Sequence, residues 1–197
     1  MDKDTLDKFA IREVIGNWAI WRDTGDFEQL TTCFHDDGVM NASWFQGPKA
    51  VFVERAKASF ARGSMSSHAL GGTSIDLAGT RAVAQTRVTI ATREVIEGAL
   101  YDIACTGRFY DLFEQRAGRW AIAMRQPTYE KDRADPVMPG KTIQFDEALL
   151  ASFPPGYRFL GYAQTRRGLD VLRDLPGLRG PEIEALYAQG RAWLAGA

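Results

Sequence analysis

The stretch that decides the fold lies between residues 82 and 129 and contains three long segments: AVAQTRVTIATREV (82–95), LYDIACTGRFYDLF (100–113) and RWAIAMRQPTY (119–129). These segments contain many of the β-branched and aromatic residues that favour strands. Gly98 and the pair Ala117-Gly118 separate them, as expected for hairpin turns. Residues 66–77 are also extended in character and end at the turn Ala78-Gly79-Thr80. The pattern predicts a meander of four long antiparallel strands.

Helical segments precede this meander. In residues 4–23 the apolar side chains recur every three or four positions, as in an amphipathic helix: Ile11, Val14, Ile15, Trp18 and Trp21. We expect a second helix over residues 27–34, capped by Asp26, and a short strand over residues 38–44. A third helix is expected over residues 49–62, after Gly47-Pro48. Helices followed by consecutive antiparallel strands predict an α+β fold. Long strands of this kind curl readily, so the helices can cover a concave face.

Composition argues against several classes of protein. The 197 residues carry 24 basic and 25 acidic side chains, and no block of five like charges occurs. Neither a nucleic acid nor a membrane surface is therefore an expected partner. The two cysteines lie far apart and match no metal-ligand spacing, which favours a reducing compartment. The N-terminus is acidic and no long apolar segment follows it, so we expect a cytoplasmic location. No nucleotide fingerprint or phosphate loop is present, so we expect no cofactor.

The length fits one domain with an extension. We expect the domain over residues 1–130 and the extension over residues 131–197. The extension begins with a Pro- and Gly-rich arm over residues 130–160 that has a possible helical turn at 146–152. Residues 157–173 show no decisive pattern, and residues 181–195 are typical of a closing helix. The apolar side chains of the extension could close a pocket or pack on a neighbouring subunit. They include Leu160, Tyr162, Leu169, Val171 and Leu172.

Several short motifs follow one another along the chain in the order seen in a known protein family. They are Trp21-Arg22-Asp23-Thr24-Gly25-Asp26-Phe27, Phe34-His35-Asp36-Asp37-Gly38, the helix start at Gly47, Ser67-His68-Ala69-Leu70, and Gly118-Arg119-Trp120. Over about residues 5–130 the chain resembles the SnoaL-like branch of the nuclear-transport-factor-2-like superfamily. The resemblance implies a cone-shaped, cystatin-like α+β barrel in which the N-terminal helices close an internal pocket. It also implies a homodimer or homotrimer, because a partner usually covers the open convex face of such a sheet.

Within this superfamily the chain looks like the cofactor-free lyases. These include scytalone dehydratase, hexachlorocyclohexane dehydrochlorinase, bile acid 7α-dehydratase, and lyases that release formaldehyde from lignin-derived diarylpropanes. The resemblance implies an acid/base pair formed by Asp23, at the end of the first helix, and His68, on the first long strand. Trp18 and Arg22 stand where bile acid 7α-dehydratase and scytalone dehydratase, respectively, have tyrosines. Those departures argue against either dehydratase type. Together with the three tryptophans between Trp18 and Trp44, the departure from the bile-acid enzyme favours lignin-like aromatic substrates.

The residues themselves leave the roles of this pair open. Asp23 shares a helical face with the small or apolar Gly16, Ala19 and Ile20, where a carboxylate would be poorly solvated and would need an N–H partner. It could instead be a solvated residue at the helix end. His68 could be that partner and could move a proton near neutral pH, or it could be a histidine that is satisfied in the core.

Seven further side chains are candidates to line the pocket: Trp18, Trp21, Arg22, Trp44, Phe45, Arg108 and Tyr110. The aromatic residues could contact a phenolic substrate or only pack in the core. The arginines could hold an oxyanion or phenolate, or form salt bridges elsewhere. Tyr101 and Tyr110 point to opposite faces of one strand, and we expect Tyr110 to face the pocket because it shares a face with Arg108.

A metal centre is not expected. His35 lies in a polar turn and is predicted to be structural, and the adjacent residues His35-Asp36-Asp37 cannot all face one ion.

The function predicted from the sequence is that of a cofactor-independent lyase. It would eliminate water or formaldehyde from a small hydrophobic compound, phenolic or lignin-derived. One alternative is a non-catalytic binding module, since fold does not determine function. Another is an isomerase or cyclase that uses the same pair without a leaving group. A binding module would have no need for the acid/base pair, so the pair separates it from the enzymes.

Overall fold

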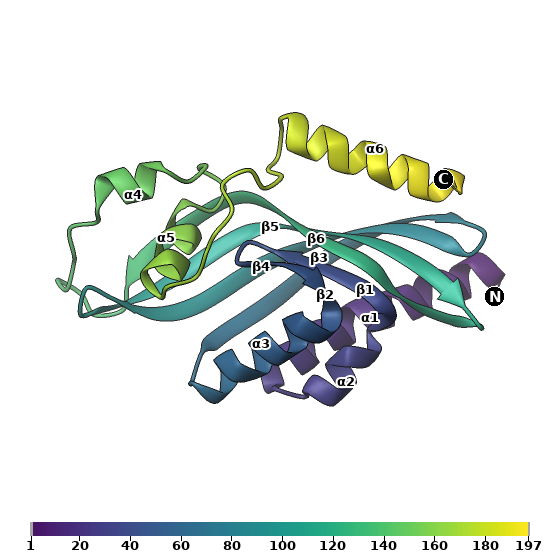
Figure 1. The fold of residues 1–197 in the computed structure, drawn as a ribbon, viewed down its shortest axis with the longest axis horizontal. Helices are drawn as coiled ribbons and strands as arrows, with labels where there is room; N and C mark the ends of the chain where they lie inside the picture. Colours follow the sequence, from purple (N-terminus) through teal and green to yellow (C-terminus); the bar gives the residue numbers. More distant parts are fainter. Residues whose placement is uncertain (1, 197) are drawn as a thin grey trace.

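A six-stranded sheet forms the centre of the structure, a computed structural model that describes residues 2–196 (Figure 1). Its strands are β1 (Phe34–Ala42), β2 (Phe45–Pro48), β3 (Met65–Ala78), β4 (Arg81–Ile96), β5 (Ala99–Arg116) and β6 (Arg119–Pro136). Their order in the sheet is β2-β1-β6-β5-β4-β3. The predicted antiparallel meander, β3 to β6, is confirmed. Strand β1 pairs antiparallel with β2 and in parallel with β6, so the sheet is antiparallel at every junction except the one between β1 and β6.

Six helices pack on this sheet within the described residues. They are α1 (Lys3–Thr24), α2 (Phe27–Thr32), α3 (Lys49–Ala61), α4 (Glu147–Ala151), α5 (Arg158–Arg166) and α6 (Pro181–Ala195). The side chain of Asp2 caps the start of α1, and Gly25 ends it with a positive φ of 82° that glycine adopts without strain. Residues 157–173, where the sequence pattern was ambiguous, contain α5.

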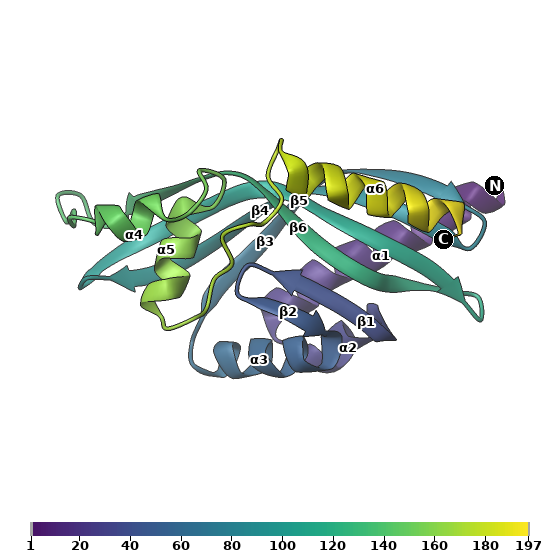
Figure 2. The ribbon, with the colours of Figure 1, turned by 45° about the horizontal axis from the view of Figure 1, so that its top comes forward.

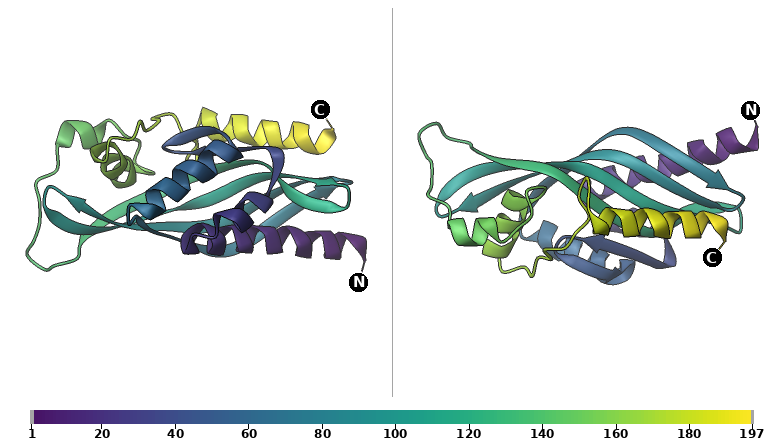
Figure 3. Two further views of the ribbon diagram at one scale, coloured as in Figure 1. Left: turned by 60° about the horizontal axis from the view of Figure 1, so that its bottom comes forward. Right: turned by 90° about the horizontal axis from the view of Figure 1, so that it is seen from above.

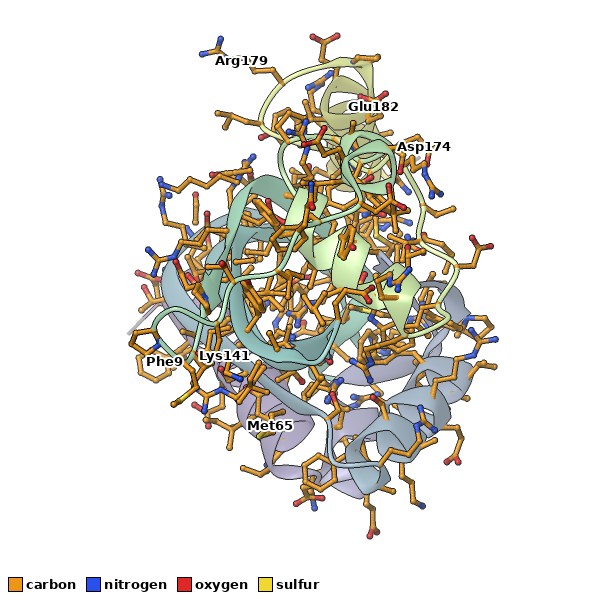
Figure 4. All side chains as sticks on the ribbon, turned by 90° about the vertical axis from the view of Figure 1, so that its left-hand side faces the viewer. Phe9, Met65, Lys141, Asp174, Arg179 and Glu182 are labelled. Carbon is orange, nitrogen blue, oxygen red and sulfur yellow. The ribbon has the colours of Figure 1, made fainter. Side chains whose placement is uncertain are left out.

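The helices lie on both faces of the sheet. Figure 3 (left) shows α1 and α6 on opposite sides of the strands, and Figures 1 and 2 show α2 and α3 on the side of α1. Side chains along β5 point alternately to the two faces of the sheet. Phe109 packs in the core beneath α1 and α3, whereas Tyr110 packs against α6 on the other face. Seen end-on in Figure 4, the strands curl around a dense interior of side chains. The predicted curved α+β architecture is therefore confirmed.

The C-terminal extension packs on the sheet of its own chain. Strand β6 continues to Pro136, so the predicted boundary at residue 130 falls inside a strand. Beyond it, Phe153, Tyr157 and Leu160 pack against Tyr101 and other side chains of the long strands. Helix α6 covers part of the sheet face that a partner subunit was expected to cover. The argument for an oligomer from an open face therefore does not apply to that area.

Two observations concern the cytoplasmic location that the sequence predicts. In the part of the chain that the structure describes, no helix is long and apolar enough to cross a membrane. Cys33 and Cys105 are buried and unpaired, and burial raises the pKa of the Cys33 thiol to about 12.

Candidate functional site

A cavity of about 400 Å³ opens between α1, α3, α5 and the strands β3 and β4. A smaller chamber of about 50 Å³ adjoins it on the inside. Both chambers are lined by Arg22, Trp44, His68, Ile90, Leu160 and Gln164. Two of these, Leu160 and Gln164, come from α5. The extension therefore supplies a wall of the pocket, and the hydroxyl of Ser43 holds Gln164 in place by a hydrogen bond of 2.7 Å.

Asp23 and His68 meet at the edge of this pocket. Asp23 lies in the last turn of α1, and His68 lies on β3. The ring atom Nδ1 of His68 is 2.6 Å from Oδ1 of Asp23, and the backbone N–H of His68 donates to Oδ2, also at 2.6 Å. A carboxylate only accepts, so Nδ1 carries the proton and Nε2 keeps a lone pair. Within the described residues Nε2 has no hydrogen-bond partner, which leaves it available to a ligand.

Aromatic side chains surround the His68 ring. Trp18 contacts it edge-on, with 5.2 Å between the ring centroids, and Phe109 lies 6.1 Å away. Burial lowers the pKa of His68, and the hydrogen bond and charge of Asp23 oppose that shift only in part. The imidazole is therefore neutral at pH 7. A neutral ring held by a carboxylate is a suitable general base, because the carboxylate stabilises the imidazolium that forms when the ring takes a proton.

Arg22 supplies a buried positive charge. Its side chain lines both chambers, and the residue is 8% exposed. Burial lowers the pKa of its guanidinium and the Asp23 charge opposes this, but an arginine stays protonated in a protein. Within residues 2–196 the guanidinium donates to no protein acceptor. Its N–H groups are therefore available to an oxyanion or a carboxylate of a ligand.

A second buried arginine lies behind the aromatic wall. Arg125 and Asp111 are fully buried and form two hydrogen bonds of 2.7 Å. The guanidinium lies over the rings of Trp18 and Phe109, at 4.4 Å and 4.2 Å from their centroids. Its charge also contributes to the lowered pKa of His68. Sequence reasoning missed this pair because the two residues face each other only through a register shift between β5 and β6.

The structure brings together four of the predicted pocket and catalytic residues as lining: Trp18, Arg22, Trp44 and His68. Asp23 supports His68 from behind. Trp21 is partly buried and packs against the main core, and it is absent from both linings. Phe45 packs against Phe52 with 6.0 Å between the ring centroids, so it too belongs to the core rather than to the pocket.

The predictions for Arg108 and Tyr110 were wrong. They share a face, as expected, but it is the face that α6 covers. Arg108 donates to Glu130, Gln85 and Tyr187, and Tyr110 packs against Tyr187. Alternation along β5 turns the intervening Phe109 toward the pocket instead.

Other pocket residues were not anticipated. Tyr129 of β6 lines the inner chamber, and Gln164 lines both. Arg55 of α3 and Arg62, which caps the C-terminal end of that helix, line the outer chamber. Their spacing of seven, which favours one face of a helix, was a signal available in the sequence. The tail offered no comparable signal for Gln164.

His35 has a structural role, since its ring bonds to the carbonyl of Glu114 at 2.9 Å. Among the described residues no cluster of three or more His, Cys, Asp or Glu side chains could hold a metal ion.

Known proteins similar to this chain agree with the fold. Two relatives from the fungus Fusarium vanettenii, a PEP2-like protein and pea pathogenicity protein 2, are 34% and 33% identical; each alignment covers 99% of this chain and 88% of the relative. A solved protein from Kribbella flavida superposes with a TM-score of 0.59 at 19% identity, over 67% of this chain and 95% of its own. A provisionally assigned scytalone dehydratase from Novosphingobium aromaticivorans gives a TM-score of 0.57 at 17% identity, over 72% and 97%.

The family itself follows from a direct match. The model of the SnoaL-like domain matches residues 3–126, which include α1 to α3 and most of the sheet together with Asp23 and His68. The chain therefore belongs to the SnoaL-like domain family.

Proposed function

We propose that this protein is a cofactor-independent lyase that eliminates a small leaving group, water or formaldehyde, from a hydrophobic aromatic compound. The observation that carries the proposal is the pairing of Asp23 with the Nδ1 atom of His68 at the edge of a pocket. It leaves the other ring nitrogen without a partner among the described residues, on a side chain that lines both chambers. A module that only binds a ligand has no need for such a pair.

The pair can perform both proton transfers of an elimination. Nε2 of His68 takes a proton from the substrate: from a carbon if water is to leave, or from a primary hydroxyl if formaldehyde is to leave. Asp23 stabilises the resulting imidazolium. For water, the electrons of the broken C–H bond form a C=C bond and the C–O bond breaks, and the imidazolium returns its proton to the departing hydroxyl oxygen. For formaldehyde, the electrons of the broken O–H bond form the C=O bond and the adjacent C–C bond breaks, and the imidazolium returns its proton to the carbon that keeps the electrons of that bond.

The pocket supports an aromatic substrate. Trp18, Phe52, Phe109 and Tyr129 line the inner chamber. At about 50 Å³ it is too small for a whole ring, so a substrate ring would lie in the outer chamber beside Trp44 and His68, with its edge toward these aromatic side chains. Arg22 borders the same chamber with an unused guanidinium, which can stabilise a phenolate or another oxyanion as charge develops. A phenol in conjugation with the reacting carbon would give Arg22 such a charge.

The test is a screen of phenolic diarylpropanes and of hydroxylated aromatic compounds with the purified protein. Released formaldehyde, new near-ultraviolet absorbance and product mass are measured together. A lyase product is lighter than its substrate by the mass of water or of formaldehyde, whereas an isomerase or cyclase product keeps the mass. Turnover should fall by about two to four orders of magnitude in His68→Ala, the range that general acid–base catalysis contributes.

Asp26→Asn is the matched control, because Asp26 caps α2 in the turn that follows Asp23 and asparagine caps a helix equally well. Turnover that survives unchanged in both His68→Ala and Asp23→Asn would refute the proposed role of the pair.

A further inference from the structure

The outer chamber of the pocket carries an excess of positive charge. Four arginines contribute to its lining, namely Arg22, Arg55, Arg62 and Arg167, against one carboxylate, that of Glu94. The whole chain has a net charge of −1, so this excess is local.

Besides Arg22, two of these arginines form no ion pair within the described residues. Arg167 donates to Glu94 at 2.7 Å, and these two charges balance each other. Arg55 lies over the ring of Phe45, 5.1 Å from its centroid, and forms no ion pair within the described residues. Arg62 likewise has no carboxylate within 4.0 Å in that part of the chain. Both side chains are exposed at the mouth of the pocket, where they can turn toward a ligand.

The two chambers therefore differ in chemistry. The inner one is lined mainly by aromatic and apolar side chains, whereas the outer one has three further arginines and several hydroxyl side chains, among them Ser59, Ser64 and Ser66. A molecule that spans both would place a ring next to His68 and a polar, negatively charged group near α3. Arginine suits a carboxylate because its planar N–H groups match the two oxygens.

We propose that the outer chamber is an anion subsite that selects substrates carrying a carboxylate at the end remote from the reacting carbon. The inference rests on the proposed function in naming a substrate, but the subsite itself can be tested without turnover. Arg55 and Arg62 are the residues that determine this specificity, and they take no part in the chemical step.

The test uses two probes of one shape and different charge, para-phenylbenzoate and para-phenylbenzamide. Binding of each to the full chain is measured by isothermal titration calorimetry at low and at high salt. The carboxylate should bind about tenfold more tightly than the amide at low salt, and this preference should shrink as salt screens the exposed arginines. Arg55→Gln and Arg62→Gln should each weaken carboxylate binding about two- to fivefold and leave amide binding unchanged.

Two controls distinguish this subsite from a general effect of surface charge and from the catalytic pair. Arg179→Gln removes an exposed arginine that Figure 4 places on the opposite side of the molecule from Met65, the neighbour of the pocket residue Ser66, and it should have no effect. His68→Ala should lower turnover by about two to four orders of magnitude yet keep the preference for the carboxylate. Equal affinity for both probes, no binding of either, or a preference that persists in the Arg55→Gln/Arg62→Gln double variant would overturn the subsite. Loss of turnover in His68→Ala would still support the proposed function.

Discussion

The substitution Asp23→Asn should reverse the hydrogen-bonding role of His68 in the pocket. Both oxygens of Asp23 accept, one from the backbone N–H of His68 and one from its ring atom Nδ1, each at 2.6 Å. Asparagine offers one oxygen and one NH₂ group. The backbone N–H can only donate, so it keeps the oxygen and the NH₂ group turns toward Nδ1. The ring must then accept at Nδ1 and carry its proton on Nε2, the atom that the proposed base needs unprotonated.

The expected magnitudes follow from these contacts. Loss of a general base costs about 10² to 10⁴ in rate, which is about 2.7 to 5.5 kcal/mol of activation free energy. Replacing two hydrogen bonds to a carboxylate by bonds to a neutral amide should also lower the free energy of unfolding. A hydrogen bond to a charged group contributes about 1.5 to 3 kcal/mol, and a neutral one about 0.5 to 1.5 kcal/mol. We therefore expect a loss of about 1 to 3 kcal/mol in urea denaturation.

Nitrogen NMR of the imidazole rings tests this without any substrate. The chain has two histidines, and the second, His35, provides a reference because its Nε2 bonds to the carbonyl of Glu114 and must carry the proton. In the native chain His68 should show the opposite tautomer, with the proton on Nδ1. In Asp23→Asn it should match His35, and in the control Asp26→Asn it should not change. A proton on Nε2 of His68 in the native chain, or one that stays on Nδ1 in Asp23→Asn, would refute the reasoning.

Three further predictions concern stability and pH. Asp111→Ala leaves a buried arginine unpaired and should cost about 3 to 5 kcal/mol in urea denaturation, whereas Asp102→Ala breaks an exposed pair and should cost less than about 1 kcal/mol; equal losses would contradict this. Gly190→Ala should destabilise the chain by about 1 to 3 kcal/mol, because its Cβ would lie 1.9 Å from the hydroxyl of Tyr110; an unchanged denaturation midpoint would show that Tyr110 yields freely. Burial lowers the pKa of His68 below its ordinary value of 6.5, so turnover should stay constant down to about that pH and fall only in more acidic solution. A decline in turnover that begins well above pH 6.5 would contradict a neutral buried base.

The sequence is sufficient to predict the local elements, and its resemblance to a family indicates that Asp23 and His68 lie together. The spacing of apolar residues in α1 and the turn residues between the long strands depend on neighbours close in the chain, and the predicted segments agree with the observed ones within a few residues for most elements. The two residues at the centre of the site, Asp23 and His68, came from family motifs that are local as well. The structure then brings them together as those motifs imply.

Which face of a strand turns toward the pocket was decided only by the tertiary structure. Alternation has a period of two, so it shows that Arg108 and Tyr110 share a face but does not show which helix covers that face. Helix α6 lies near the far end of the chain and packs there, so Phe109 is left for the pocket. The wall that α5 supplies depends in the same way on a distant segment folding back.

The buried ion pair of Asp111 and Arg125 depends on strand register, which the sequence does not predict either. A hairpin that continued the pairing of Arg116 with Arg119 would place Asp111 opposite Met124. A shift between Leu112 and Phe113 moves the register by one residue and places Asp111 opposite Arg125. Periodicity and turns determine what each segment of this chain becomes, because they act between near neighbours. Register, facing and closure of the pocket were decided only when distant segments packed together.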